Sequence, residues 1–252
     1  MSILERDNWT DKSIDFMISD IMEYDMKRGG LSIIKTDNLL PSHIIDRLES
    51  KEKRAADKEI GVMQKTDKNL KEGLLNGFRK YRLEFGALNE LEDEDIISVK
   101  KDAIFTKKYC PYTRVRDNII FVEKNHYEAF LRLNGCEFYW GPDHKLDVKG
   151  IHDNQIHLHE KYMLDFIWNF LRYLCNYDAD GARKYIVHFI DEYKCKQLPI
   201  EYYREFNTKS IYTYIMYDNI TEATYLDPAY KHLVIGNYNF INIIVPLLNY
   251  VI

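Results

Sequence analysis

The 252-residue chain lacks long apolar runs, and it has few cysteines, prolines and glycines. No segment approaches the roughly 20 apolar residues that cross a bilayer, and residues 1–10 contain no apolar signal core. The four cysteines are widely spaced and form no C-x-x-C pair, which argues against a zinc or disulfide framework. We therefore expect a cytoplasmic protein, located in the host cytoplasm if the gene is viral.

The short motifs of several common catalytic sites are also missing. The sequence has no Gly-rich phosphate loop and no nucleophile elbow. Its net charge of −5 is opposite in sign to that of a dedicated non-specific nucleic-acid binder. The charge is uneven, however, since residues 47–58 and 100–116 are rich in Lys and Arg. A local basic surface can therefore exist on an acidic protein.

The distribution of apolar residues predicts an α+β fold with a sizeable core. Helical spacing predicts helices over residues 12–23, 41–58, 69–86, 159–174 and 182–193, and Gly29-Gly30 suggests a tight turn or a close backbone approach. Segments rich in Ile, Val and aromatic residues predict strands within 96–106, 118–122, 127–140 and 146–151. Because the links are short, we expect an antiparallel sheet with helices on one face and a helical C-terminal part.

Two isolated aspartates stand out as candidates for metal-assisted chemistry. Phosphoryl transfer to a 3′-hydroxyl commonly uses two metal ions, which carboxylates on adjacent strands can bind, with basic groups to hold the triphosphate. Asp25 and Asp102 each lie at an apolar segment, and the basic segment 47–58 lies between them. As a non-catalytic alternative, the two aspartates form turns or ion pairs. The alternative for segment 47–58 is a solvent-exposed helix face with pairs of opposite charge.

Five segments, in order, resemble those of family B DNA polymerases. Residues 25–34 (DMKRGGLSII) resemble the first palm motif, D-x-x-S-L-Y-P-S-I. Residues 53–61 (KRAADKEIG) are similar to the fingers motif K-x-x-x-N-S-x-Y-G, and residues 97–105 (ISVKKDAIF) resemble Y-G-D-T-D-S-I-F. Residues 121–131 (FVEKNHYEAFL) and 146–151 (LDVKGI) resemble F-E-K-x-Y-x-x-F-L and D-x-K-G-I. The resemblance covers about residues 21–151.

This resemblance implies a palm-like domain over 1–151 with a short fingers-like insertion at about 37–90, and a thumb-like region over 152–252. It implies a nucleotidyltransferase that uses Mg²⁺ or Mn²⁺ and acts on nucleic acid and nucleoside triphosphates, with no membrane partner. The implied site residues are Asp25 and Asp102 as catalytic metal ligands, Glu123 as a third acidic group, Lys53, Arg54, Arg47 and Gly30 at the nucleotide, and Lys149 and Tyr127 at the nucleic acid.

Two departures from the family pattern leave other functions open. Lys100 stands where the family has the first Asp of its third motif, which weakens metal affinity unless Lys100 points away. Gly30 replaces the tyrosine under the sugar, so an active enzyme is expected to discriminate poorly against ribonucleotides. One alternative is a catalytically decayed palm that binds nucleic acid or a replication or defence partner. The other is an unrelated interaction protein. The compactness suits a phage or mobile element.

Overall fold

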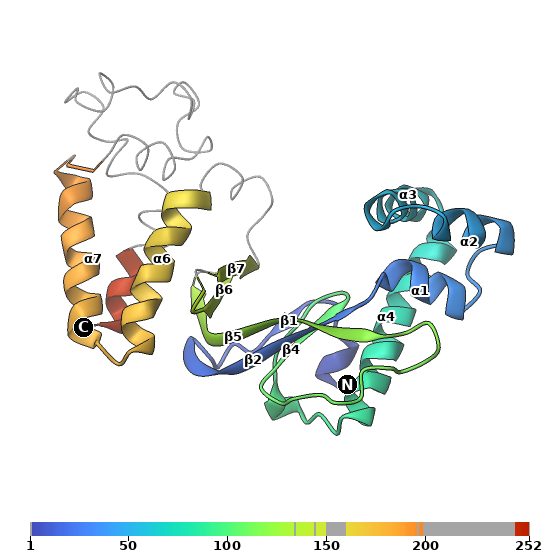
Figure 1. Cartoon of the computed structure of the whole chain (residues 1–252), viewed down its shortest axis with the longest axis horizontal. Coiled ribbons are helices and arrows are strands. Elements are labelled where there is room, and N and C mark those ends of the chain that lie inside the picture. Colours follow the sequence, from blue (N-terminus) through green and yellow to red (C-terminus); the bar gives the residue numbers. More distant parts are fainter. Residues whose placement is uncertain are drawn as a thin grey trace, which may run out of the picture. The chain divides into compact units, whose positions relative to one another are not determined.

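The structure is a computed structural model that describes residues 2–133, 135–143, 145–149, 160–195, 197–198 and 245–251. Its fold is α+β, with seven strands in the order β1-β3-β4-β2-β5-β6-β7 (Figure 1). The pairs β1–β3, β3–β4, β4–β2, β5–β6 and β6–β7 are antiparallel. The α+β class and the antiparallel sheet are therefore confirmed.

The strands are β1 (Trp9–Thr10), β2 (Phe16–Met26), β3 (Ile96–Val99), β4 (Ala103–Thr106), β5 (Phe121–Leu133), β6 (Cys136–Gly141) and β7 (Lys145–Lys149). The helices are α1 (Gly29–Thr36), α2 (Ser42–Glu49), α3 (Lys53–Thr66), α4 (Lys68–Leu88), α6 (Glu160–Cys175) and α7 (Ala179–Lys194). Short 3-10 helices are η1 (Ile3–Glu5), η2 (Asp93–Asp95) and η6 (Val245–Tyr250).

The chain divides into two compact units. The first contains Met1–Ser13 and Asp20–His126, and the second contains Ile14–Ser19 and Tyr127–Ile252. The division falls after residue 126 and not at the predicted residue 151. The reason is that the aromatic and aliphatic residues of β5 and β6 share a core with α6 and α7.

In the first unit, helix α4 packs on one face of the sheet. The Asp67 side chain accepts a hydrogen bond from the Leu70 N–H (3.0 Å), which caps the start of the helix. The buried face of α4 carries Leu70, Leu74, Phe78, Tyr81 and Phe85 at helical spacing. This face shares a core with Met22, Tyr24 and Met26 of β2, while α1 and α3 also pack on α4.

In the second unit, two tryptophans join the sheet to the helices. The Trp140 and Trp168 rings stack with centroids 5.8 Å apart. Each indole N–H donates to a backbone carbonyl: Trp140 to Trp168 (3.2 Å) and Trp168 to Gly141 (2.9 Å). Both buried indole N–H groups therefore have an acceptor, so the aromatic pair stabilises this core without leaving a buried donor unpaired.

Three expectations for local structure are wrong. Residues 16–26 form strand β2 and not a helix, because pairing with β4 and packing of Met22, Tyr24 and Met26 against α4 outweigh the helical spacing. The single helix expected over 41–58 is two helices, α2 and α3. Gly29 and Gly30 open helix α1, and the left-handed residue is Arg28 (φ 48°).

Other expectations hold. The close approach does occur at Gly29, where a Cβ would lie 2.9 Å from Cε1 of Phe78. The helices expected over 69–86, 159–174 and 182–193 correspond to α4, α6 and α7, and the strand expected over 146–151 corresponds to β7. His159, Gly150 and Ile151, at the ends of these predictions, lie outside the described residues.

Close packing of α1 on α4 should make Gly77 intolerant of a side chain. A Cβ there would lie 2.3 Å from Cγ2 of Ile33 in α1. We expect Gly77→Ala to lower the free energy of unfolding by ~1–3 kcal/mol through overpacking. Gly61, inside α3, has no atom within 4 Å of its Cβ position, so Gly61→Ala should stabilise by up to ~1 kcal/mol. Urea denaturation of both variants measures the difference, and equal effects would contradict the packing.

Candidate active site

The two predicted aspartates lie near each other in the first unit, one on a strand and one in a hairpin turn. Strands β3 and β4 form a hairpin whose turn contains Asp102, and β4 pairs with β2 so that Asp25 lies opposite Ala103. The Met26 N–H donates to the carbonyl of Asp102 (2.9 Å), which extends this pairing into the turn. The pairing therefore brings Asp25 and Asp102 near each other, while their role as metal ligands stays a prediction.

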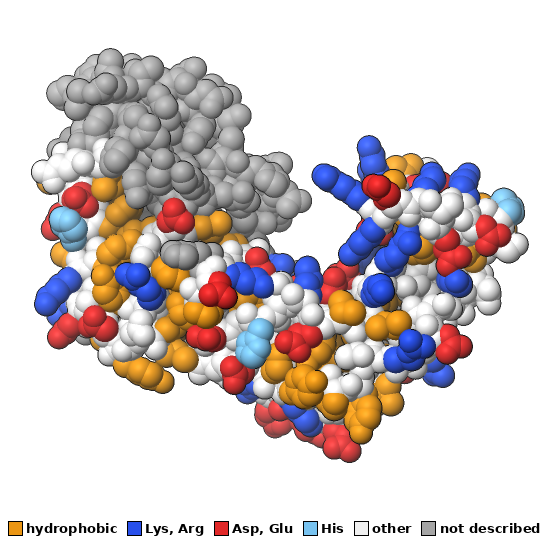
Figure 2. Space-filling view, in the orientation of Figure 1, with side chains coloured by type: hydrophobic (Ala, Val, Ile, Leu, Met, Phe, Trp, Pro, Cys, Tyr) orange, Lys and Arg blue, Asp and Glu red, His pale blue; other side chains and the backbone are white. Residues whose placement is uncertain are grey.

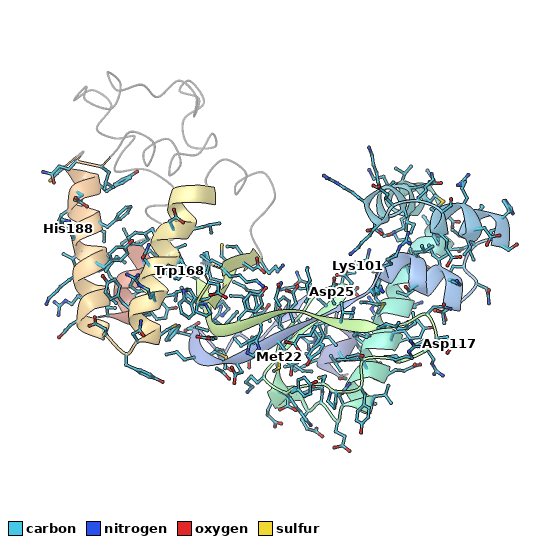
Figure 3. The ribbon with its side chains drawn as sticks, viewed as in Figure 1. Met22, Asp25, Lys101, Asp117, Trp168 and His188 are labelled. Carbon is cyan, nitrogen blue, oxygen red and sulfur yellow. The ribbon has the colours of Figure 1, made fainter. Side chains whose placement is uncertain are left out.

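Asp25 lies on the sheet face opposite α4. Side chains alternate along a strand, and Met22 and Tyr24 occupy the helix-covered core (Figure 3). The Asp25 side chain is partly buried, whereas Asp102 is exposed at the turn. Burial, followed by the negative charge of Asp102, raises the pKa of Asp25 to about 6. Lys124 and Lys53 oppose this increase in pKa with their positive charges.

A buried glutamate two residues before Asp25 organises the same face. Glu23 is 1% exposed, and its carboxylate accepts hydrogen bonds from Asn125 and from Lys124 Nζ (3.4 Å) on β5. This ion pair keeps the Lys124 ammonium near Asp25. The sequence analysis missed both Glu23 and Lys124. Glu23 could have been found from the sequence if residues 16–26 had been predicted as a strand. Alternate side chains of a strand share one face, so Glu23 lies on the same face as Asp25.

The hairpin turn is anchored by a wholly buried arginine. Arg82 of α4 donates to the carbonyls of Leu4 (3.0 Å), Arg6 (2.7 Å) and Lys101, the residue before Asp102. Burial lowers the pKa of Arg82 to about 10. Arg82 therefore ties the N-terminal segment and the turn to the helix, which holds Asp102 in place. Nothing in the helical spacing of α4 distinguishes this arginine from a surface residue.

The basic residues predicted at the nucleotide have different environments. Lys53 begins helix α3, is exposed, and its charge acts on Asp25. Arg54 is the next residue and is also exposed. Arg47 instead pairs with Glu59, which Lys51 also contacts, so it connects α2 to α3. Lys and Arg side chains gather over this helical part of the first unit (Figure 2).

Gly30 lies at the contact between α1 and α3. A Cβ at this position would make ordinary van der Waals contact with Ile60 of α3, 3.7 Å from its Cγ2. The position therefore has room for a small side chain, and the helix contact does not require glycine there.

Two other predicted residues do not join the site. Glu123 shares a face of β5 with Phe121, which is in the α4-side core. Burial above all raises the pKa of Tyr24 in that core to about 12, and the charge of Glu123 adds to the shift. Glu123 is therefore on the wrong face to complete a metal site with Asp25. Tyr127 is fully buried, so its predicted contact with nucleic acid is also wrong.

Lys149 and Lys100 remain to be placed. Lys149 is half-buried in β7 of the second unit, opposite Glu137 of β6. Lys100, which stands in place of a family carboxylate, directs its ammonium to Asn8 (3.1 Å) and to Thr10 of β1 (3.3 Å). Strand β1 lies on the other side of the hairpin from β2. Lys100 therefore points away from Asp25.

The donor set fits a divalent cation that arrives with a substrate. Among the described residues, no group of three or more His, Cys, Asp or Glu side chains could hold a metal ion. Mg²⁺ is usually bound by only one or two carboxylates together with substrate phosphates and water. Asp25 and Asp102 meet that requirement, and a cation between them would relieve the repulsion that raises the pKa of Asp25.

These features define an α+β protein with a paired-carboxylate site on an antiparallel sheet. The chain belongs to the Bacteriophage PBS1 gene 130 protein family, whose family model matches residues 1–252. No curated protein matches the chain. None of the helices in the described part of the chain is long and apolar enough to cross a membrane.

The raised pKa of Asp25 should make stability depend on pH. The folded state keeps the Asp25 proton up to about pH 6, whereas an unfolded carboxyl loses it near 3.8. Stability from this group is present below pH 4 and is lost as the pH rises to 6. Above pH 6, Asp25→Asn should be more stable than wild type by ~1 kcal/mol, discounted for solvent screening. Denaturation between pH 4 and 8 measures this difference, with the exposed Asp46→Asn as control.

Loss of Arg82 should release the hairpin turn. Arg82→Met keeps an apolar stem but leaves three backbone carbonyls without their donor, which we expect to destabilise by ~3 kcal/mol or more. Hydrogen exchange at the Met26 amide, which reports the bond to Asp102, should accelerate more than exchange in α6. Equal acceleration in both places would show that Arg82 supports the fold without holding the turn.

Proposed function

We propose that this chain is a compact family-B-like polymerase that transfers nucleotides to nucleic acid with Mg²⁺ or Mn²⁺. One observation supports this most directly. A strand aspartate and a hairpin-turn aspartate lie close enough for the charge of one to raise the pKa of the other. They lie where the resemblance to the first and third palm motifs expects the metal-binding carboxylates. Lys100, the main departure from that pattern, is directed to Asn8 and Thr10.

In this proposal, Asp25 and Asp102 would hold the metal ions, which when bound would supply charge neutralisation at the reacting phosphates and activation of the primer 3′-hydroxyl. Arg82 keeps Asp102 at the turn. The primer oxygen attacks the α-phosphorus while pyrophosphate leaves. Lys53 and Arg54 at the start of α3 bind the triphosphate and stabilise the negative charge on the leaving pyrophosphate.

Lys124 has a supporting electrostatic role in the proposed site. Its ion pair with Glu23 holds a positive charge beside Asp25. That charge favours the ionised form of Asp25, which is the form that binds a cation. The partners are nucleic acid and nucleoside triphosphates, and membership of a phage protein family supports action in the host cytoplasm.

The second candidate is a palm-derived protein that has lost catalysis and binds nucleic acid or a replication or defence partner. It is favoured by Lys100, a cation where the family has an acid, and by the finding that no group of three or more His, Cys, Asp or Glu side chains among the described residues could hold a metal ion. In this case the protein binds nucleic acid without any metal-dependent turnover.

A primer-extension assay with Mg²⁺ or Mn²⁺ tests the proposal. Wild type should incorporate nucleotides, and Asp25→Asn and Asp102→Asn should each lose at least ~10²-fold in rate, the scale of one lost preorganised electrostatic contact. Asp46→Asn, an exposed aspartate of α2, should retain full activity. Turnover by both site variants at the wild-type rate would reject the carboxylate mechanism. Nucleic-acid binding without incorporation by wild type would favour the decayed palm.

A further inference from the structure

A pocket lies in the first unit between α1 and the segment that precedes β5. Its volume is about 220 Å³, below the roughly 300–1,000 Å³ of pockets for drug-sized ligands. The polar residues that line it are Lys27, Arg28, Ser32, Lys35, Asp117 and Asn118, together with Glu49. Asp25, Asp102 and Lys53 do not line it, so the proposed catalytic site leaves this pocket unexplained.

The pocket carries a positive charge that is only partly compensated. Lys35 forms an ion pair with Glu49 at 2.6 Å, which neutralises both. Lys27 is exposed, and none of the described residues forms an ion pair or hydrogen bond with its ammonium. The pocket has three cationic side chains and two acidic ones, which leaves one net positive charge. The cationic residues are Lys27, Arg28 and Lys35, and the acidic residues are Glu49 and Asp117. One phosphodiester carries one negative charge and matches it.

Arg28 offers an unused donor at this pocket. Its backbone is left-handed (φ 48°), and Nη2 donates to the carbonyls of Lys51 (3.1 Å) and Leu48 (3.4 Å). Those two bonds fix the guanidinium, while Nε is buried and has no acceptor among the described residues. A buried charged donor without an acceptor is destabilising, and a ligand oxygen would remove that penalty.

The unused donors are suited to an oxyanion. Lys27 provides an ammonium, Arg28 an N–H, and Asn118 a side-chain amide, which together can surround the two non-bridging oxygens of a phosphate group. We propose that this pocket binds one phosphodiester group of a nucleic-acid strand. That the strand is nucleic acid rests on the proposed function, whereas the phosphate contact itself is tested without catalysis.

The experiment measures binding of a fluorescein-labelled single-stranded DNA oligonucleotide by anisotropy, without metal ions or nucleoside triphosphates. Lys27→Ala should weaken binding by about tenfold and reduce the slope of log affinity against log salt by ~1. Asn118→Ala should weaken binding and leave that slope unchanged, because no charge is removed. The matched control is Lys71→Ala, an exposed lysine of α4 that does not line the pocket.

Equal binding by Lys27→Ala and Lys71→Ala would overturn the proposal, since only general charge would then matter. Competition with inorganic phosphate separates the two sources of the ligand. If inorganic phosphate displaces the oligonucleotide from wild type at a concentration similar to that of the oligonucleotide, the pocket is a site for free phosphate. That result would reject the assignment to a nucleic-acid strand. Weakened binding by Lys27→Ala with full binding by Lys71→Ala would support the pocket even if no incorporation is ever detected.

Discussion

The pairing of strand β2 with the β3–β4 hairpin is the constraint on which the candidate site depends. It places Asp25 opposite Ala103 and joins the Met26 amide to the Asp102 carbonyl. A shift of the register by one residue would turn Asp25 into the α4-side core and Met26 out of it. Burial of Met22, Tyr24 and Met26 against α4 therefore fixes which face carries the carboxylate.

The electrostatic arrangement of the site works against folding. Two negative charges lie near each other, and one of them is partly buried. The raised pKa of Asp25 shows that its ionised form is less stable in the folded protein than in water. Compensation comes from Lys124 and Lys53, and from the deeply buried Arg82 that secures the turn. Perturbed pKa values of this kind are concentrated at functional sites. The proposed catalytic role rests on this shift together with the strand pairing that brings the two aspartates near each other.

The basic residues of the first unit serve at least two purposes. Arg47 and Lys51 hold α2 to α3 through Glu59, so part of the positive charge of segment 47–58 is structural. Lys53 and Arg54 remain exposed at the start of α3, and Lys27 and Arg28 line a separate pocket. An acidic protein can thus present two local cationic surfaces, because charge acts over about a Debye length of roughly 10 Å and not over the whole molecule.

The sequence by itself determined the α+β class and the helices α4, α6 and α7, because these depend on local periodicity. It failed where tertiary contacts decide the outcome. Residues 12–23 have helical spacing, yet residues 16–26 form a strand, since their partners β4 and α4 lie far away in the chain. Only the tertiary structure put Glu123 on the wrong face, buried Tyr127, turned Lys100 toward β1 and brought Lys124 to Asp25. The direction of a side chain depends on strand register and on neighbours distant in sequence, and neither can be read from local spacing.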